Sequence, residues 1–416
     1  MLKQLILENW KSYKYAELNI DPLTILIGTN ASGKSNALDG LQFLNRVASG
    51  IDFQSALAGD PNIPSIRGGI EWAALKPYNQ FTLKVLVEGD DDRTDYLYSI
   101  TIETVPIQLI SEALVRIKRR PQTNKNPYII NLFRTDEATT EQPSMVARLY
   151  NGKQGSPKDM RRSHSILSQM GSALTLRSEI EEGVKAVTDI LSRIFILDPI
   201  PSLMRYYSQL TQKLNSDASN IAGVLAALSE AQKKEIEDTL SRYAAKLPER
   251  DIRRVWAETV GKFNADAMLY CEEIWIPNGE STIIDARGMS DGTLRFLAIL
   301  TALLTQPEGS QIVIEEVDNG LHPSRSDLLL RILQEIGSKR HVDILVTTHN
   351  PALIDKLVPD LVPFVVIAHR DPETGESKLT LLEDVQNIPK LMAVGSLGTL
   401  VTQGSLERSL AGQHGK

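Results

Sequence analysis

Eight residues near the N-terminus have the types and the spacing of a phosphate-binding loop. The segment GTNASGKS, Gly28 to Ser35, fits the pattern G-x-x-x-x-G-K-[ST]. Gly28 and Gly33 permit backbone turns that a Cβ atom would forbid, so several N–H groups can point inward at one phosphate. Lys34 places a cation on the β and γ oxygens, and Ser35 offers a hydroxyl ligand to Mg²⁺. The segment predicts a site for Mg²⁺ and ATP; the alternative is a Gly/Ser-rich turn that matches by accident.

A second group of candidates is the pair of adjacent carboxylates in QIVIEEVDNGLHPS, residues 311–324. Three apolar residues lead directly into Glu315 and Glu316, and two uncompensated charges at the end of a buried strand would be costly. A metal ion and a water molecule relieve that cost if Glu315 positions Mg²⁺, directly or through water, and Glu316 orients and polarises the attacking water. The alternative is an exposed strand end with incidental acidic residues.

Two further segments could complete such a site. In RGMSDGTLRFLAILTALL, Ser290 and Gly292 come just before an apolar helix, whose free N–H groups can bind an anion. Ser290 is also a good N-cap, which is the simpler interpretation. Because one chain already holds the γ-phosphate in its own P-loop, a second anion site would serve the ATP of another subunit. His349, at the end of LVTTHN, is expected to approach the same γ-phosphate, although a histidine after an apolar strand is usually structural.

Short apolar strands that alternate with helices are predicted to position these residues. The run PLTILIG, residues 22–28, is typical of a buried strand, and helical spacing follows it. Further strands are predicted at residues 311–314 and 343–347, and helices at residues 293–304 and 324–336. Alternation of this kind indicates an α/β sheet.

The middle of the chain has a different character. Strand-like segments separated by polar turns extend from about Phe81 to Arg134. The segments 174–196, 222–246 and 250–263 are rich in Ala, Leu, Glu, Lys and Arg, and are predicted to be helices. We therefore expect three parts, namely an N-terminal lobe over residues 1–165, a helical insertion over 166–275 and a C-terminal lobe over 276–416.

Composition excludes several classes of protein. Cys271 is the only cysteine in 416 residues, which excludes a disulfide framework and a multi-cysteine zinc site and suits a reducing cytoplasm. The opening LKQLILENW lacks the features of a signal peptide, and the longest apolar runs fall short of the ~20 residues of a membrane span, so neither segment is expected. With a net charge of −7, a general affinity for polyanions is not indicated. Two basic clusters, Arg116–Arg120 and Lys158–Arg162, are candidates for binding nucleic acid, and the simpler interpretation of each is a solvated face.

Four motifs occur in the order expected of one family. GTNASGKS, MSDGT, IVIEEVDNGLHP and LVTTHNP follow one another as in the head of the ABC-type ATPases of the SMC/RecF/OLD group, which the chain resembles over residues 1–70 and 280–355. It most resembles stand-alone bacterial AAA-like ATPases with an EE-x-x-NGLHP segment, many of them components of anti-phage systems. ENWKSYKYAELNI is similar to the opening of that group, with Trp10 where Phe is usual and Lys11 near the expected nucleotide. The resemblance implies an α/β fold, a P-loop ABC-type ATPase head of two lobes with a largely helical insertion.

The resemblance also implies roles for single residues. It implies that the nucleotide is bound by Lys11, Gly28, Thr29, Asn30, Ala31, Ser32, Gly33, Lys34, Ser35, Asn36, Ser290, Asp291 and Gly292. It implies that Mg²⁺ is bound by Ser35 and Glu315. It implies that the catalytic residues are Lys34, Glu316 and the switch histidine His349.

Three features depart from the family pattern or imitate another one. His322 stands where the D-loop aspartate of transporters would be, which puts the D-loop contacts across a dimer in doubt. A Q-loop glutamine has only imperfect candidates, namely Gln42, Gln54 and Gln80. KVLVEGDDD, residues 84–92, resembles the first motif of a Toprim nuclease, but no later D-x-D partner completes a two-metal site. A β-turn between two strands accounts for it, so the head is OLD-like without a Toprim domain.

The first functional hypothesis is an ATP-switched homodimer in the cytoplasm. Two heads would sandwich two ATP molecules and reopen on hydrolysis, with oligomers above a dimer left open. The partner would be a separate effector protein, a nuclease or a toxin, in anti-phage defence. The alternative is a RecF-like repair and recombination ATPase that acts directly on DNA through the two basic clusters. A transporter subunit fits poorly because of the NGLHP turn, and a scaffold with an inert ATP site fits poorly because Glu316 is present.

Overall fold

The computed structural model describes most of the chain and divides it into two compact units. The described residues are 1–119, 126–138, 142–150, 155–173, 177–247, 251–274, 279–357, 359–385 and 395–411. The first unit comprises Met1–Ile194, Pro363–Ile388 and Gly404–Lys416, and the second comprises Phe195–Val362 and Pro389–Gln403. Segments distant in sequence therefore belong to the same unit, and each unit is described by itself.

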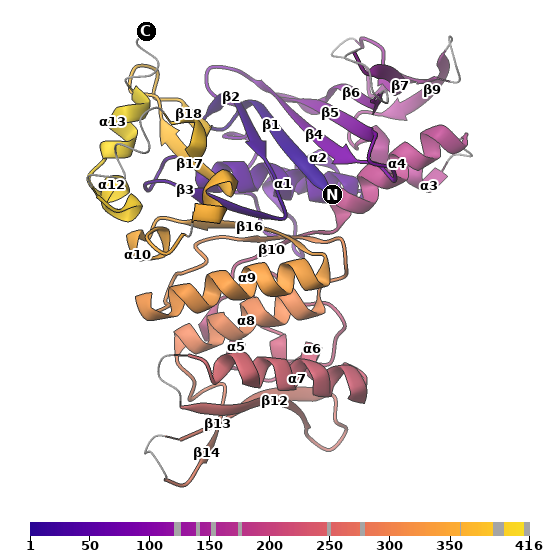
Figure 1. The fold of residues 1–416 in the computed structure, drawn as a ribbon. Coiled ribbons are helices and arrows are strands. Elements are labelled where there is room, and N and C mark those ends of the chain that lie inside the picture. The colour runs from indigo at the N-terminus through magenta and orange to yellow at the C-terminus, as the bar shows by residue number, and fades with distance from the viewer. Residues whose placement is uncertain are drawn as a thin grey trace. The chain divides into compact units, whose positions relative to one another are not determined.

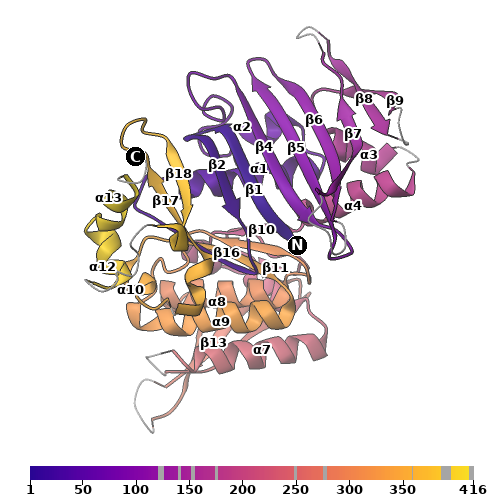
Figure 2. The ribbon, with the colours of Figure 1, turned by 45° about the horizontal axis from the view of Figure 1, so that its top comes forward.

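An antiparallel sheet of eight strands dominates the first unit (Figure 2). Its order is β2-β1-β4-β5-β6-β7-β8-β9. The strands are β1 (Leu2–Trp10), β2 (Tyr13–Asn19), β4 (Gln80–Glu88), β5 (Thr94–Thr104), β6 (Ile107–Lys118), β7 (Tyr128–Thr135), β8 (Ser144–Tyr150) and β9 (Gly155–Arg161). Alternate residues of β4 are buried, as expected of a strand with one face on the core. The strands predicted between Phe81 and Arg134 are confirmed. So is the turn at KVLVEGDDD, because β4 and β5 pair as an antiparallel hairpin.

Helices cover one face of this sheet, as Figure 1 shows for α1 behind β1 and β4. The helices of the first unit are α1 (Lys34–Ala48), α2 (Phe53–Ala58), α3 (Ile166–Ala173), α4 (Ser178–Ser192) and α13 (Ser405–Ala411). Aromatic side chains fill the space between α1 and the sheet. The ring of Trp10 lies 4.8 Å from that of Phe81 in an edge-on arrangement, and the ring of Phe43 lies 5.5 Å from Phe81. Such pairs add to the stability that burial alone provides.

A short parallel pair of strands carries the phosphate-binding segment of the first unit. β3 (Leu23–Ile27) pairs in parallel with β17 (Val365–Arg370), and β17 pairs antiparallel with β18 (Ser377–Leu381), which η3 (Leu382–Asp384) follows. All five residues of β3 are buried, which explains its continuous apolar run. The buried strand predicted in PLTILIG is therefore confirmed.

The second unit contains a β-α-β segment that holds the acidic motif. β15 (Gln311–Ile314) pairs in parallel with β16 (Asp343–Thr348), and they are linked through η1 (Pro323–Arg325) and α9 (Ser326–Arg340). α8 (Asp291–Thr305) packs against α9 and against α7 (Glu230–Ala244). The strands and helices predicted in this part of the sequence are confirmed, with ends that differ by a few residues. α10 (Pro351–Ile354), η2 (Pro359–Phe364) and α12 (Leu397–Thr402) follow.

The prediction that residues 250–263 form a helix is wrong. They contain β12 (Ile252–Val260), which pairs antiparallel with β13 (Asp266–Glu273). Val255, Trp256 and Ala257 are buried in this pairing, so contacts with a neighbouring strand override the helical preference of the composition. The small sheet is completed by β11 (Ser208–Gln209) and β14 (Thr282–Asp285), which both pair with β13.

The other predicted helices of the middle segment are shorter than expected. The segment 174–196 gives α4, and its last residues enter β10 (Ile194–Leu197), while residues 174–176 lie outside the described part. The segment 222–246 divides into α6 (Ile221–Ala226) and α7, because Ser229 begins a new helix as its N-cap residue. α5 (Pro201–Met204) is one turn long. Among the described residues, no helix is both long enough and apolar enough to cross a bilayer.

Candidate functional site

The predicted phosphate-binding loop lies where β3 ends and α1 begins. The loop from Gly28 to Gly33 contains three residues with positive φ, namely Gly28 at +152°, Ala31 at +63° and Gly33 at +114°. Left-handed residues among right-handed ones turn successive N–H groups toward one side, which makes a concave anion site. α1 starts at Lys34, so its free N–H groups and the positive end of its dipole face the same region.

Both glycines of the motif are required by close neighbours within the first unit. A Cβ atom on Gly28 would lie 2.3 Å from the carbonyl oxygen of Ala368. A Cβ atom on Gly33 would lie 2.5 Å from Ser377 Oγ and 2.8 Å from the hydroxyl of Tyr13. That hydroxyl donates a hydrogen bond of 3.0 Å to the Gly33 carbonyl. Burial raises the pKa of the Tyr13 phenol, so it remains a protonated donor that fixes the end of the loop.

The side chains of the loop fit a phosphate. Lys34 Nζ donates to the carbonyl oxygens of Gly28 at 2.7 Å and Thr29 at 2.9 Å, so the ammonium already lies at the mouth of the loop. Carbonyl oxygens are neutral acceptors, and an anionic oxygen forms a stronger bond with the same ammonium. Ser32 Oγ is buried and has no hydrogen-bond partner among the described residues, although buried hydroxyl groups are usually paired. A phosphate would supply an acceptor to both groups.

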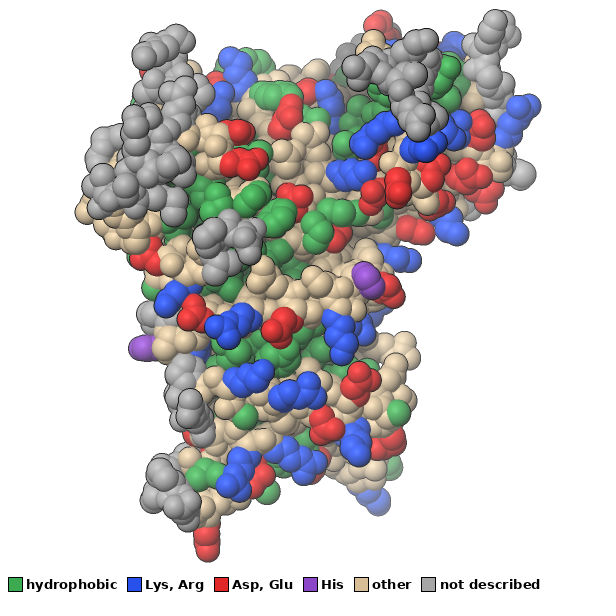
Figure 3. Space-filling model, viewed as in Figure 1, with side chains coloured by type: hydrophobic (Ala, Val, Ile, Leu, Met, Phe, Trp, Pro, Cys, Tyr) green, Lys and Arg blue, Asp and Glu red, His purple; other side chains and the backbone are tan. Residues whose placement is uncertain are grey.

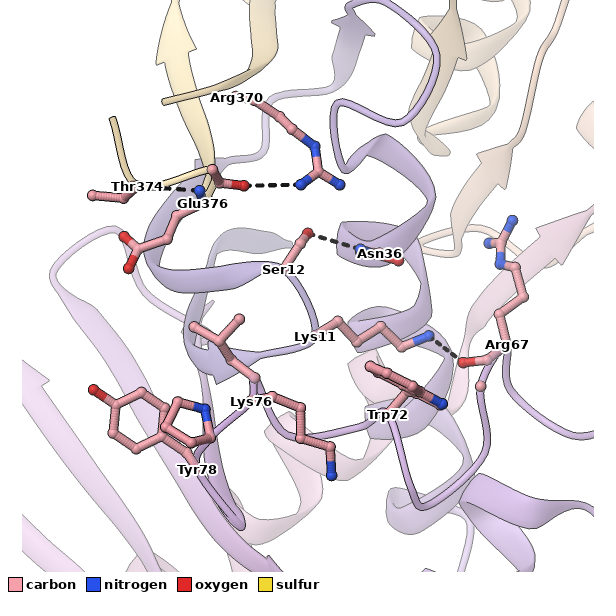
Figure 4. Close-up of a pocket in the computed structure, with 14 residues that line it drawn as sticks. Lys11, Ser12, Asn36, Arg67, Trp72, Lys76, Tyr78, Arg370, Thr374 and Glu376 are labelled. Atoms are coloured by element: carbon pink, nitrogen blue, oxygen red, sulfur yellow. Dashed lines mark hydrogen bonds between the residues drawn. The ribbon is translucent and has the colours of Figure 1, made fainter. Parts of the chain in front are cut away.

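A cavity of about 630 Å³ adjoins the loop in the first unit (Figure 4). Arg370 lies on its wall and donates from Nε to the Ala31 carbonyl at 2.8 Å, which joins the cavity to the phosphate-binding loop. Figure 4 shows Arg370, Thr374 and Glu376 on one side of Ser12, and Lys76 and Tyr78 on the other. A cavity of this size, with aromatic and charged walls, is large enough for a small organic ligand.

Lys11 and Asn36, both expected to contact the nucleotide, line this cavity. The Lys11 ammonium is held by Asp39 Oδ2 at 2.5 Å and by the Arg67 carbonyl at 2.6 Å. Burial lowers the pKa of Lys11, opposed by the carboxylate of Asp39. Asn36 Nδ2 donates to Ser12 Oγ at 2.7 Å, and its carbonyl accepts from the indole of Trp10 at 2.7 Å. Hydrogen bonds thus connect residues 10–12 with the first turns of α1.

Sequence reasoning did not identify the other residues of this cavity. They include Arg67, Trp72, Tyr78, Arg370 and Glu376. One feature of the sequence could have indicated Arg370, because it closely follows a buried apolar run, as Glu315 and Glu316 do. The remaining residues lie in irregular segments without a motif.

The paired glutamates of the second unit follow β15 directly. Glu316 has a φ of +47°, a conformation that side-chain-bearing residues rarely adopt and that is often found at functional sites. Its N–H donates to Thr347 Oγ1 at 2.9 Å, and the next N–H, of Val317, donates to the Thr347 carbonyl at 3.0 Å. Thr347 is fully buried near the end of β16, so it fixes the strained backbone of Glu316. No motif in the sequence indicates this role for Thr347.

Glu316 and His349 meet in the second unit, as their shared role predicts. His349 Nδ1 lies 3.4 Å from Glu316 Oε1, and their side chains are 44% and 40% exposed. Glu315 is half-buried beside them. A carboxylate and an imidazole at this distance, both open to solvent, can hold a water molecule or share a proton.

Ser290, Asp291 and Gly292, which the sequence predicts to bind the ATP of another subunit and which we call the signature loop, lie at the start of α8 in the same unit. Ser290 is the N-cap residue, and its Oγ accepts from the Thr293 N–H at 3.1 Å, which confirms the simpler interpretation. Gly292 cannot be replaced without strain, because a Cβ atom there would lie 2.6 Å from the carbonyl of Gly320. The signature loop is therefore packed against the NGLHP turn. Asp291 is exposed and pairs with Arg205, another residue that the sequence did not indicate.

The family model described as "AAA domain, putative AbiEii toxin, Type IV TA system" matches residues 23–355. The chain belongs to this AAA family. The match extends from β3 past His349, so it covers residues 28–36, residues 290–292, the paired glutamates and His349. Membership confirms the ATPase-type head expected from the motifs, and the mixed α/β architecture agrees with it.

Solved structures similar to this AAA-family chain include SMC heads. One is an SMC head bound to the C-winged helix domain of ScpA, 15% identical over 94% of this chain and 99% of that chain, with a TM-score of 0.49. Another is an SMC head domain from Thermotoga maritima, 15% identical over 91% of this chain and 98% of that chain, with a TM-score of 0.41. A third, derived from Pyrococcus furiosus, is an Smc head domain with an extended coiled coil bound to the C-terminal domain of ScpA. It is 14% identical over 94% of this chain and 99% of that chain, with a TM-score of 0.49. No curated protein matches the chain.

The structure groups the predicted residues of this AAA-family chain in two sets. Residues 28–36 and Lys11 lie in the first unit, whereas Glu315, Glu316, His349 and residues 290–292 lie in the second. In the first set Lys11 and Asn36 line one cavity, and in the second Glu316 lies beside His349 while Gly292 packs against Gly320. The convergence of both sets on one triphosphate stays a prediction.

Three arginines of the two basic clusters have partners within the first unit. Arg116 pairs with Glu179 at 3.4 Å, and Arg119 pairs with Asp95. Arg162 is buried and donates to the Leu109 carbonyl at 2.8 Å. Arg120 lies outside the described residues. On the face in Figure 3, basic side chains lie interspersed with acidic ones, which differs from the clustered positive charge that binds a phosphate backbone.

Proposed function

We propose that this AAA-family protein binds ATP in the first unit and hydrolyses it with residues of the second. The observation that carries the proposal is the loop of residues 28–33, with its left-handed glycines and the Lys34 ammonium at its mouth. The unpartnered Ser32 hydroxyl supports it, because a bound phosphate would satisfy that group. Phosphates would lie in this loop at the start of α1.

The adjoining cavity is proposed to hold the nucleoside. Trp72 and Tyr78 are exposed aromatic side chains, on which a base can stack. Glu376 offers carboxylate oxygens to hydroxyl or amino groups, and Arg370 connects the cavity with the phosphates through Ala31. Lys11 and Asn36 also line the cavity and would lie between the nucleoside and the phosphates.

Hydrolysis is proposed to depend on positioning and electrostatic stabilisation. Glu316 would accept a hydrogen bond from the attacking water, and His349 would fix the orientation of that carboxylate. Lys34 and the N–H groups of α1 would stabilise the charge on the transferred phosphoryl group. Ser35 and Glu315 would hold Mg²⁺, which when bound neutralises phosphate charge.

We further propose that the protein works as a homodimer. The N–H groups at the start of α8, with Ser290 and Gly292, would bind the phosphates of the ATP held by a second copy. The family description names a putative toxin of a type IV toxin–antitoxin system. We propose that the protein acts with a separate effector protein, a nuclease or toxin, in anti-phage defence. Direct action on DNA is the less supported alternative, because Arg116, Arg119 and Arg162 already have partners in the protein.

The test is Glu316→Gln, measured by calorimetry with MgATP, by phosphate release and by light scattering. ATP affinity should remain close to that of the wild type, turnover should fall about 100-fold or more, and the ATP-bound protein should accumulate as a dimer. Glu308→Gln, an exposed glutamate of the same unit, should change none of these. Wild-type turnover in Glu316→Gln would remove the role assigned to Glu316.

A further inference from the structure

One arginine of the second unit binds the segment that precedes α8. Arg205 Nη1 donates to three carbonyl groups of this segment, those of Ala286 at 2.9 Å, Arg287 at 3.0 Å and Met289 at 2.7 Å. Its Nη2 donates to Asp291 Oδ1 at 2.6 Å. A single guanidinium thus makes four hydrogen bonds within six residues, and those residues end in the signature loop. The planar fork of arginine suits such a set, and lysine cannot reproduce it.

Arg205 lies between α5 and β11, and both elements hold its backbone. It follows α5 directly, and α5 is anchored because Met204 is buried and the Ile200 N–H donates to the Asp217 carbonyl at 3.0 Å. A few residues later, Ser208 enters β11 and pairs with β13. The backbone of Arg205 is therefore held on both sides, and its side chain transfers that fixed position to the loop.

The loop before α8 has few other restraints. Ala286 and Met289 are buried, whereas Arg287, Gly288, Ser290 and Asp291 are exposed. Two backbone bonds hold its N–H groups, from Ala286 to the Leu269 carbonyl at 2.9 Å and from Gly288 to the Asp285 carbonyl at 2.9 Å. Arg205 donates hydrogen bonds to the carbonyl groups of the loop.

Arg205 also changes the charge at the start of α8. Asp291, the first residue of α8, has a side chain that is 68% exposed. A carboxylate there favours the helix dipole, but it would repel an approaching phosphate. The ion pair with Arg205 draws this carboxylate to one side and offsets its charge. The N–H groups of α8 can then meet an anion without that repulsion.

We infer that Arg205 is a positioning residue for the signature loop. It holds Ser290 and Gly292 in place through the preceding carbonyls, and it neutralises Asp291 so that α8 can accept the phosphates of ATP bound to a second copy of the chain. This inference rests on the proposed ATP-dependent dimer. It adds a residue about eighty positions upstream of the motif, and it assigns that residue to dimer formation rather than to binding of nucleotide by the P-loop.

The experiment uses the full chain with Glu316→Gln, so that ATP is bound but not consumed. Arg205→Ala in this background should leave MgATP affinity of the monomer unchanged, measured by calorimetry at low protein concentration. It should weaken ATP-dependent dimerisation about tenfold or more, measured by sedimentation. Arg205→Lys should lie between the two, because an ammonium offsets Asp291 but cannot bond all three carbonyls. Arg287→Ala is the matched control, since its side chain is exposed and pairs with Asp285, and it should dimerise normally.

A second variant separates charge from a merely structural effect. Arg205→Ala combined with Asp291→Asn should recover part of the lost dimerisation, because the uncompensated carboxylate is gone. The inference is overturned if Arg205→Ala dimerises as tightly as its parent, if nucleotide affinity falls along with dimerisation, or if Asp291→Asn restores nothing. Should Arg205→Ala not fold, Arg205→Lys decides, and normal dimerisation of that variant overturns the inference. If Glu316→Gln binds ATP yet stays monomeric, the proposed dimer itself is wrong and the inference falls with it.

Discussion

The phosphate-binding loop of the first unit and the acidic strand end of the second are held in different ways. The loop is fixed by steric contact and by several bonds, since Gly28 and Gly33 have no room for a Cβ atom and Tyr13 and Lys34 bond its carbonyls. At the acidic end only the backbone is fixed, through Thr347, while the side chains of Glu316 and His349 stay exposed with one contact of 3.4 Å.

This difference suits two tasks. A loop that is already formed can bind a phosphate without the entropic cost of ordering itself. A carboxylate on a fixed backbone with a movable side chain can bind water or a neighbouring histidine in turn. We therefore expect changes in the first region to act on binding and changes in the second to act on turnover.

The largest effect should come from Gly28→Ala. The new Cβ atom would meet the Ala368 carbonyl at 2.3 Å in a backbone with a φ of +152°, so the loop must deform. ATP binding should become undetectable by calorimetry, and thermal unfolding should show a loss of roughly 2 kcal/mol. Gly171→Ala is the control, because Gly171 lies in α3 with open space around it. Retained ATP binding in Gly28→Ala would mean that the loop is not a preformed cradle.

An intermediate effect is expected from Thr347→Val, which keeps the shape of the side chain and removes the acceptor of the Glu316 N–H. The loss of a buried hydrogen bond costs about 1–2 kcal/mol, so the strained conformation of Glu316 should be less populated and kcat should fall about tenfold. ATP affinity should not change. Thr347→Ser retains the hydroxyl and should keep most of the activity. A drop in affinity with unchanged kcat would contradict the division of tasks.

The smallest effect should come from Tyr13→Phe, which removes one donor to the Gly33 carbonyl in a loop held by several other contacts. We expect ATP affinity to fall about fivefold, since a neutral hydrogen bond contributes about 1 kcal/mol. Tyr15→Phe on the same strand should have no effect, because that hydroxyl is exposed and bonds with Glu17. A loss of binding as complete as in Gly28→Ala would show that this one bond, and not the steric frame, forms the loop.

Local patterns in the sequence predicted the parts of the site that depend on neighbours in the chain. The apolar run of β3 followed by GTNASGKS, the two glutamates after β15 and the N-cap Ser290 all follow from turn geometry, burial or capping over a few residues. The helix predicted at residues 250–263 failed for the opposite reason, because β12 owes its conformation to pairing with β13.

The sequence alone thus determined the motifs, the elements that carry them and the α/β class, since each follows from residue types within one turn or one strand. The tertiary structure decided which distant side chains serve those motifs. Arg370 reaches Ala31 across more than 300 positions, Thr347 fixes Glu316, and Arg205 holds the loop before α8. No local periodicity encodes such contacts, because they arise only when the packing of whole elements brings a donor within bonding distance of its acceptor.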